Sequence, residues 1–415
     1  MSCAIIASNI SFSLTRMNIL FLHQNFPGQF RHIAAYLAKH PGYQVVAVGK
    51  KNAPGLEGVR LIRYDLHREP SQQAHHYVRT LETGVLHGQA VARVLLKLKA
   101  KGFVPDVVIA HPGWGEALYV KDVFPNTKLI SFFEFFYHPE GADCGFDPEF
   151  PVSFDDRTRI RSKNALHLMN LEACDIGISP TQWQKSLHPT AYHSKIEVIH
   201  EGIDTDTLRP DPEASFTLPN GVTLHAGQPI VTYVARNLEP YRGFHSFMRC
   251  LPQLLQQHPD CQVLIVGGDD VSYGSKPKDA ANWREKLQGE VSLDDSRIHF
   301  LGRIPYDSYR KVLQISAAHV YLTYPFVLSW SMLEAMASGC LVIGSGTPPV
   351  QEVIRHQENG LLVDFFDTNA LATAFTHALQ HPQQYQTLRQ TACEQAHLLY
   401  SHKHGLAAYL RLIRP

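Results

Sequence analysis

Residues 19–37 read ILFLHQNFPGQFRHIAAYL, an apolar run followed by a turn and then an amphipathic stretch. The run 19–23 is typical of a buried strand. After Gly28 the apolar residues recur at helical spacing: Phe30, Ile33, Ala34 and Leu37. A second apolar run at 44–48 completes a strand–helix–strand unit. Such a unit is typical of a parallel sheet covered by helices.

The same alternation continues along the chain. In the first half, a long helical region is expected at 73–101 and further strands at 59–63, 106–110, 128–132, 175–179 and 195–199. A polar link at 203–212 interrupts the pattern. Beyond it, strands are expected at 230–235, 262–266, 297–301, 319–323, 341–344 and 361–363, and the chain is helical from about 382.

This pattern predicts an α/β fold of two Rossmann-like domains facing each other across a cleft. We expect the first domain at 17–205 and the second at 206–384, with a C-terminal helical segment, 385–415, crossing back to the first. Residues 1–16 are expected to be a disordered leader. Their apolar stretch is broken by polar residues, which disfavours a signal peptide.

Bulk composition excludes several classes of function. Lys plus Arg and Asp plus Glu both number 38, so no global field attracts nucleic acid. No apolar stretch is long enough for a membrane helix. Seven cysteines without a C-x-x-C pair favour reduced thiols and a cytoplasmic location. The chain has 24 histidines but no H-E-x-x-H, and we expect no metal site.

A candidate phosphate site lies at residues 323–339, TYPFVLSWSMLEAMASG. A strand ends there, a loop follows, and a helix is expected to begin near Ser329, a good N-cap residue. The free N–H groups and positive dipole end of a helix start favour an anion. Glu334 lies more than one turn into this helix. It is either an acceptor for the two hydroxyls of a ribose or a solvated helix carboxylate.

Two arginines follow the strand in residues 231–243, VTYVARNLEPYRG. Arg236 and Arg242 would lie at the edge of the cleft, where they could stabilise negative charge on a departing diphosphate. The alternative is that both are ordinary surface residues.

Loops after first-half strands supply weaker signals. Residues 23–29, HQNFPGQ, place Gly28 where the backbone could closely approach a ligand. Neither this loop nor 266–269 is a G-x-G-x-x-G, which disfavours a dehydrogenase. His111 and Glu134 each follow a strand among aromatic residues able to stack on a sugar. A strand-end histidine can instead simply cap the next helix.

Taken together, three stretches resemble the family-4 retaining glycosyltransferases, which have the two-domain fold called GT-B. They are MLEAMASG at 332–339, VAR at 234–236 with RG at 242–243, and the linker VIHEGIDTD at 198–206. The resemblance implies transfer of a hexose from a nucleotide diphosphate sugar to a saccharide, lipid-linked or small-molecule acceptor. It also implies that the first domain is on the acceptor side and the second binds the nucleotide sugar.

The resemblance assigns roles in the second domain. Arg236 matches the family's phosphate-binding arginine, and Arg242 stands where the family usually has lysine. Glu334 matches the glutamate that binds ribose. The backbone at Ser331 and Met332 is expected to face the diphosphate.

Other positions match or depart from the family pattern. Gly28 matches the glycine loop near the donor phosphate, and the segment from Ile304 to Tyr306 matches the one that holds the base through its backbone. The family has a glutamate contacting the donor sugar where this chain has Phe326. The family's first-domain histidine is absent and Glu134 falls at or beside its place. We therefore expect Glu134 to act near the transferred sugar, as a catalytic group beside the two arginines, with His111 and Phe326 on the sugar or acceptor side.

The resemblance also implies transfer with retention of configuration, without a required metal and with no cofactor besides the donor. We expect the protein to act in the cytoplasm. Action at the inner face of a membrane is left open. The base, sugar, acceptor and oligomeric state are left open. Two alternatives are a nucleotide-sugar epimerase or phosphorylase-like enzyme on the same fold, and a catalytically inactive subunit that binds nucleotide sugar.

Overall fold

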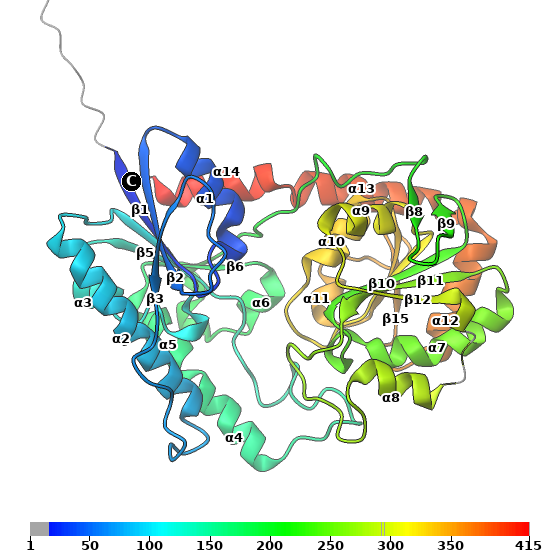
Figure 1. Ribbon diagram of the computed structural model, residues 1–415, viewed down its shortest axis with the longest axis horizontal. Coiled ribbons are helices and arrows are strands. Elements are labelled where there is room, and N and C mark those ends of the chain that lie inside the picture. Colours follow the sequence, from blue (N-terminus) through cyan, green and yellow to red (C-terminus); the bar gives the residue numbers. More distant parts are fainter. Residues whose placement is uncertain (1–15, 292, 294, 415) are drawn as a thin grey trace, which may run out of the picture. The chain divides into compact units, whose positions relative to one another are not determined.

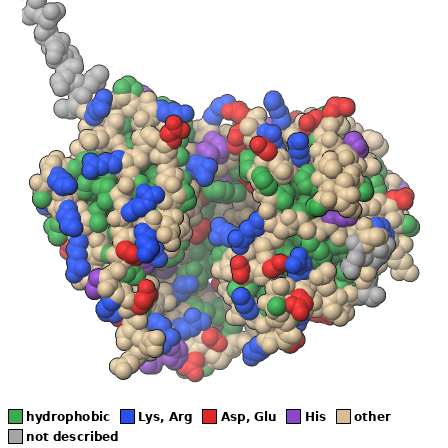
Figure 2. All heavy atoms as spheres, in the orientation of Figure 1, with side chains coloured by type: hydrophobic (Ala, Val, Ile, Leu, Met, Phe, Trp, Pro, Cys, Tyr) green, Lys and Arg blue, Asp and Glu red, His purple; other side chains and the backbone are tan. Residues whose placement is uncertain are grey.

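The computed structural model describes residues 16–291, 293 and 295–414. The expected leader, except for Arg16, lies outside the described residues. Among the helices described, none combines the length and apolar character needed to cross a bilayer. In Figure 2, Lys and Arg side chains lie interspersed with acidic and uncharged groups over the visible face.

The chain divides into two compact units. The first runs up to Phe132 and includes Ala165–Gly177. The second contains Phe133–Asn164 and everything from Ile178 onward. The segment Phe133–Asn164 therefore belongs to the second unit, although it lies in the first half of the sequence. The expected domain ranges 17–205, 206–384 and 385–415 stay predictions.

A seven-stranded sheet has the order β3-β2-β1-β4-β5-β6-β7. Its strands are β1 Met17–Leu22, β2 Tyr43–Lys50, β3 Arg60–Tyr64, β4 Val107–Ala110, β5 Lys128–Phe132, β6 Ile176–Ser179 and β7 Ile196–Val198. β1 pairs in parallel with both β2 and β4, so the strand order reverses beside it. The sheet confirms every strand expected from the first half of the sequence.

Helices connect these strands (Figure 1). They are α1 Arg31–Lys39, α2 Arg79–Ala100, α3 Val120–Val123, α4 Phe154–Lys163, α5 Ala165–Ala173 and α6 Gln182–Ser186, with short 3-10 turns η1 Gly28–Phe30, η2 Pro112–Trp114 and η3 Thr190–Lys195. The predicted apolar face of α1 is buried. The helix expected from residue 73 begins only at Arg79, because residues 71–78 form turns closed by backbone hydrogen bonds.

A second sheet of six strands has the order β12-β11-β10-β13-β14-β15, and its pairs are all parallel. Its strands are β10 Ile230–Asn237, β11 Gln262–Gly268, β12 Ile298–Gly302, β13 Ala318–Tyr321, β14 Leu341–Ser345 and β15 Leu361–Val363. Val231 and Tyr233 point into one hydrophobic core, whereas Ile230 belongs to another. Both faces are thus covered, as is usual for parallel sheets.

Most of the remaining helices cover this sheet, whereas the last one, at residues 402–413, carries Arg411, which pairs with Glu197 of β7 in the first sheet. The remaining helices are α7 Phe244–Gln257, α8 Trp283–Glu290, α9 Tyr306–Gln314, α10 Trp330–Ala337, α11 Pro348–Gln351, α12 Thr368–Gln380, α13 Gln386–Leu399 and α14 His402–Ile413, with η4 Pro240–Arg242, η5 Asp295–Arg297 and η6 Pro382–Tyr385. Helices α7 and α12 pack together, as do α10 and α13 (Figure 1). The hairpin of β8 Ser215–Thr217 and β9 Thr223–His225 was not expected from the sequence, since its strands are only three residues long.

Candidate functional site

A pocket opens in the second unit where the order of its strands reverses. β10 pairs with β11 on one side and with β13 on the other. Open α/β sheets bind ligands at such a switch point, beyond the carboxyl ends of the strands. The pocket is lined by the ends of β10 and β13, the loop after β10 and the start of α10, including Arg236, Glu239, Arg242, Tyr273, Ser329 and Ser331.

Arg242 is a buried cation in the wall of this pocket. Its Nη1 donates to Thr323 Oγ1 at 2.8 Å and to the carbonyl of Val327 at 2.9 Å. It also donates to the hydroxyl of Tyr321 at 3.2 Å. Cζ lies 5.3 Å from the ring centre of Tyr273, within the range of a cation–π contact. The guanidinium is therefore held rigidly, and it keeps its charge because arginine does not deprotonate in proteins.

Arg236 and the start of α10 also line the pocket. Arg236 is exposed, and within the described part of the chain it makes no hydrogen bond or ion pair. The backbone N–H of Ser331 donates to Ser329 Oγ at 3.3 Å, and that of Met332 to the carbonyl of Ser329 at 3.4 Å. These bonds are longer than usual, so the N–H of Ser331, which lines the pocket, can also serve another acceptor. Met332 is fully buried and is not among the residues that line the pocket. Arg236, Arg242 and Ser331 thus line one pocket.

Glu239 is a site residue that sequence reasoning missed. Its side chain is almost fully buried and accepts three backbone N–H groups, from Ser272 at 3.0 Å, Tyr273 at 3.1 Å and Gly274 at 2.9 Å. This carboxylate fixes the loop that places Tyr273 beside Arg242. Its only signal in the sequence is its position between the two arginines.

Glu334 is held by two tyrosines of α9. Tyr309 donates to Oε2 at 2.6 Å, and Tyr306 donates to Oε1 at 3.3 Å. Burial raises the pKa of Glu334, and the two tyrosine hydrogen bonds oppose that rise. The alternative of a freely solvated helix carboxylate is therefore wrong, while the ribose role stays a prediction. Ile304 precedes α9 and is half-buried against the core.

Phe326 lies in the hydrophobic core and is only 5% exposed. Its ring centre is 4.7 Å from that of Phe135 and 4.8 Å from that of Tyr273. Cζ of Arg242 is 5.9 Å from the same ring. Where the family has an acidic residue, this chain therefore has an apolar ring that supports the pocket wall. A direct contact with the sugar stays a prediction.

Glu134 follows β5 and is half-buried in the second unit. Its carbonyl accepts a hydrogen bond from Gln184 Nε2. Burial raises the pKa of Glu201 to about 8, and the negative charge of Glu134 adds to that rise. Glu201 belongs to the linker 198–206, which the sequence singled out without assigning this residue a role.

The strand order of the first sheet also reverses, between β1 and β4, and histidines follow both strands. The rings of His23 and His111 are 5.3 Å apart, and His111 stacks on Trp114 at 4.3 Å. His111 also accepts the N–H of Gly113 at 3.2 Å, which is the capping role left open above. Gly28 has φ +47, and a Cβ there would lie 2.3 Å from His23 Nε2, so only glycine fits. The predicted ligand roles of Gly28 and His111 stay predictions.

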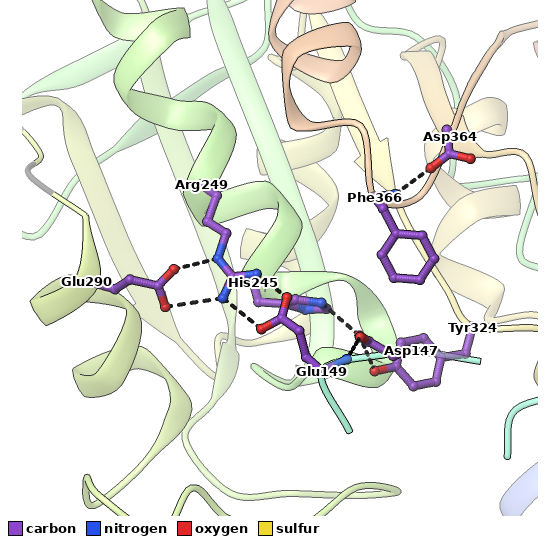
Figure 3. Close-up of polar contacts among 8 residues, drawn as sticks. All are labelled: Asp147, Glu149, His245, Arg249, Glu290, Tyr324, Asp364 and Phe366. Atoms are coloured by element: carbon purple, nitrogen blue, oxygen red, sulfur yellow. Dashed lines mark hydrogen bonds and ion pairs between the residues drawn. The ribbon is translucent and has the colours of Figure 1, made fainter. Parts of the chain in front are cut away.

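Within the described residues, Asp147, Glu149 and His245 bring metal-ligand atoms within 4.8 Å of one another. These groups have protein partners (Figure 3). Asp147 accepts the hydroxyl of Tyr324 at 2.6 Å and lies 3.0 Å from His245 Nε2. Glu149 is paired with Arg249. A metal ion would have to compete with the guanidinium of Arg249 for Glu149. The cluster is therefore better suited to holding the segment Phe133–Asn164 onto α7.

Profiles of two sequence families match successive parts of the chain. The profile described as "Glycosyl transferase family 4 group" matches residues 41–208, and that described as "Glycosyl transferases group 1" matches residues 218–395. The chain belongs to the family-4, group 1 glycosyltransferases. This family membership confirms the resemblance inferred from the three sequence stretches.

Curated relatives match this chain over part of their length. A D-inositol 3-phosphate glycosyltransferase of Nocardioides sp. is 26% identical over 259 residues, covering 59% of this chain and 54% of that protein. A phosphatidyl-myo-inositol mannosyltransferase of Mycobacterium tuberculosis is 27% identical over 227 residues, covering 48% and 55%. The chain thus spans about half the length of these relatives.

Solved structures confirm the fold over nearly the whole chain. Sucrose-phosphate synthase from Thermosynechococcus elongatus has a TM-score of 0.68 at 20% identity, covering 96% of this chain and 98% of that one. Anabaena HepE in complex with UDP-glucose has a TM-score of 0.65 at 17% identity, covering 96% and 100%. At these identities the likeness establishes two Rossmann-like α/β domains, as expected from the sequence.

Proposed function

We propose that this glycosyltransferase moves a hexose from a nucleotide diphosphate sugar to a saccharide, lipid-linked or small-molecule acceptor. The observation that carries the proposal is the pocket that combines Arg236, Arg242 and the start of α10. The diphosphate gains negative charge as its bond to the sugar breaks. One cation about 4 Å away contributes on the order of 4 kcal/mol at an effective dielectric near 20, before desolvation. Charge stabilisation of this kind accelerates the chemical step when it is strongest in the transition state.

The proposed reaction retains the configuration of the sugar. The acceptor hydroxyl approaches from the face of the leaving group, its oxygen bonds to the anomeric carbon, and the bond from that carbon to the diphosphate breaks. The proton passes to a donor phosphate oxygen. Arg236 and Arg242 supply the positive charge, so the proposed reaction requires no metal and no cofactor besides the donor. Glu134 acts near the transferred sugar.

The acceptor is assigned to the first unit, where His23, His111 and Trp114 form an aromatic group after β1 and β4. Aromatic rings suit the apolar faces of sugars and polyols. The names of the curated relatives, which mention an inositol phosphate and a phosphatidylinositol, support a small-molecule or lipid-linked acceptor. We place the reaction in the cytoplasm, including the inner face of a membrane.

Product analysis tests this function. The protein is incubated with UDP-, GDP- and ADP-hexoses, with and without lipid and metabolite extracts as acceptors, and released nucleoside diphosphate and the anomeric configuration of the product are measured. We expect acceptor-dependent release of nucleoside diphosphate with retained configuration. Donor isomerisation without an acceptor would identify an epimerase, and a requirement for inorganic phosphate a phosphorylase. Donor binding without turnover would identify an inactive subunit.

A further inference from the structure

Two tyrosines of α9 donate to the same carboxylate, one to each oxygen. Tyr306 and Tyr309 are three residues apart, so they share one face of the helix. Their partner, Glu334, lies on α10. The two hydrogen bonds differ in length and the two rings differ in exposure, and this difference suggests separate tasks.

We propose that Tyr309 is a positioning residue, which orients the carboxylate of Glu334 to bind the ribose of the donor. Tyr306 instead donates a hydrogen bond to that carboxylate in the free protein, and a ribose hydroxyl replaces it when nucleotide binds. The inference rests on the proposed function and deepens it.

Tyr309 has the features of a permanent partner. Its side chain is 8% exposed and belongs to the core that also contains Met332 and Leu333 of α10. The hydroxyl donates to Oε2 at 2.6 Å, the short distance of a charge-assisted hydrogen bond. Because the ring is packed and the bond is short, the carboxylate of Glu334 is held in one orientation.

Tyr306 has the features of an exchangeable partner. It is the first residue of α9 and is 47% exposed. Its hydroxyl is 3.3 Å from Oε1, beyond the usual range for two oxygens. An ionised carboxylate offers about four acceptor positions. One ribose hydroxyl can therefore replace Tyr306 on Oε1, while the other uses the remaining position on Oε2 beside Tyr309.

The experiment measures ribose discrimination in the full chain. Dissociation constants are determined for UDP, GDP and ADP and for their 2′-deoxy counterparts, and the ratio of deoxy to ribo values is calculated for the tightest pair. The variants are Y309F, Y306F and E334D, each checked by thermal unfolding. A hydrogen bond to a charged group predicts a wild-type ratio of about ten or more. For Y309F the ratio should fall toward one, with the ribonucleotide bound about tenfold more weakly.

For Y306F we expect the ratio to be kept or raised, with the ribonucleotide bound at least as tightly as by the wild type, because a competitor is removed. E334D keeps the charge but shortens the side chain, and it should lose discrimination as Y309F does. If Y309F does not fold, the opposite responses of Y306F and E334D carry the test. An unchanged ratio in Y309F, or a collapsed ratio in Y306F, overturns the inference.

Wild-type results separate this inference from the proposed function. A chain that binds nucleoside diphosphates with a ratio near one keeps its nucleotide site, and only the role of the tyrosine pair is contradicted. A chain that binds none of the three diphosphates contradicts the donor site itself, and the inference is lost with it.

Discussion

The two sheets share a topology but differ in the chemistry at their switch points. In the second sheet, between β10 and β13, the pocket has two arginines and the start of a helix. In the first sheet, between β1 and β4, the group is made of the rings of His23, His111 and Trp114. The same strand arrangement therefore carries two guanidinium groups in one case and aromatic rings in the other, of which those of His23 and His111 are buried. The topology of the two sheets is alike, and their loop residues set the chemistry at each switch point.

Arg242→Ala should have the largest effect, because this cation belongs to both the pocket and the core. Turnover should fall about a thousandfold, at the upper end of the loss for a deleted transition-state donor. Truncation also leaves Thr323 Oγ1 and the carbonyl of Val327 without their donor. This loss should lower the free energy of unfolding by about 1–3 kcal/mol and Tm by several degrees. Steady-state kinetics and thermal unfolding check both effects. Loss of stability with normal turnover would make Arg242 purely structural.

Arg236→Ala separates catalysis from stability, since Arg236 is exposed and free of partners in the described chain. Turnover should fall about a hundredfold or more while Tm changes by about 1 °C or less. Arg236→Lys, which keeps the charge, should recover part of the rate. Near wild-type transfer by the alanine variant would contradict the phosphate role.

Glu239→Gln should loosen the loop 272–274, because an amide oxygen cannot accept all three backbone N–H groups. We expect nucleoside diphosphate to bind about tenfold more weakly and the amides of 272–274 to exchange faster with deuterium. Glu290→Gln, at an exposed carboxylate paired with Arg249, is the matched control and should change neither measurement. Unaltered exchange in Glu239→Gln would contradict its role in holding this loop.

Trp114→Ala tests the other side of the comparison and should have the smallest effect. Because the variant loses a ring that stacks on the acceptor, we expect the acceptor KM to rise about three- to tenfold. The dissociation constant of the donor should stay within about twofold of wild type. Tyr36→Ala removes another partly exposed ring of the first unit and serves as control. A weaker donor affinity in Trp114→Ala with an unaltered acceptor KM would reverse the assignment of the two switch points.

Most of the fold could be predicted because buried parallel strands and amphipathic helices have strong periodic signals. Short elements such as β8 and β9 were not predicted, since three residues carry too little pattern. The assignment of Phe133–Asn164 to the second unit was also not predicted, because it depends on side-chain partners distant in sequence, such as Asp147 with Tyr324.

The candidate site was predictable only in part. Arg236, Arg242 and Ser331 could be assigned to one pocket, because the two arginines lie at or shortly after the end of a strand and Ser331 lies in the first turn of a helix. The contacts of Glu239 with backbone N–H groups and of Tyr309 with Glu334 could not, since both join segments more than 20 residues apart through side-chain geometry.

The decisive experiment on the pocket beside β10 is a crystal structure of the chain with its tightest-binding nucleoside diphosphate. We expect phosphate oxygens about 2.7–3.2 Å from the guanidinium groups of Arg236 and Arg242 and from the backbone N–H of Ser331. A diphosphate bound elsewhere, with this pocket empty, would contradict this expectation.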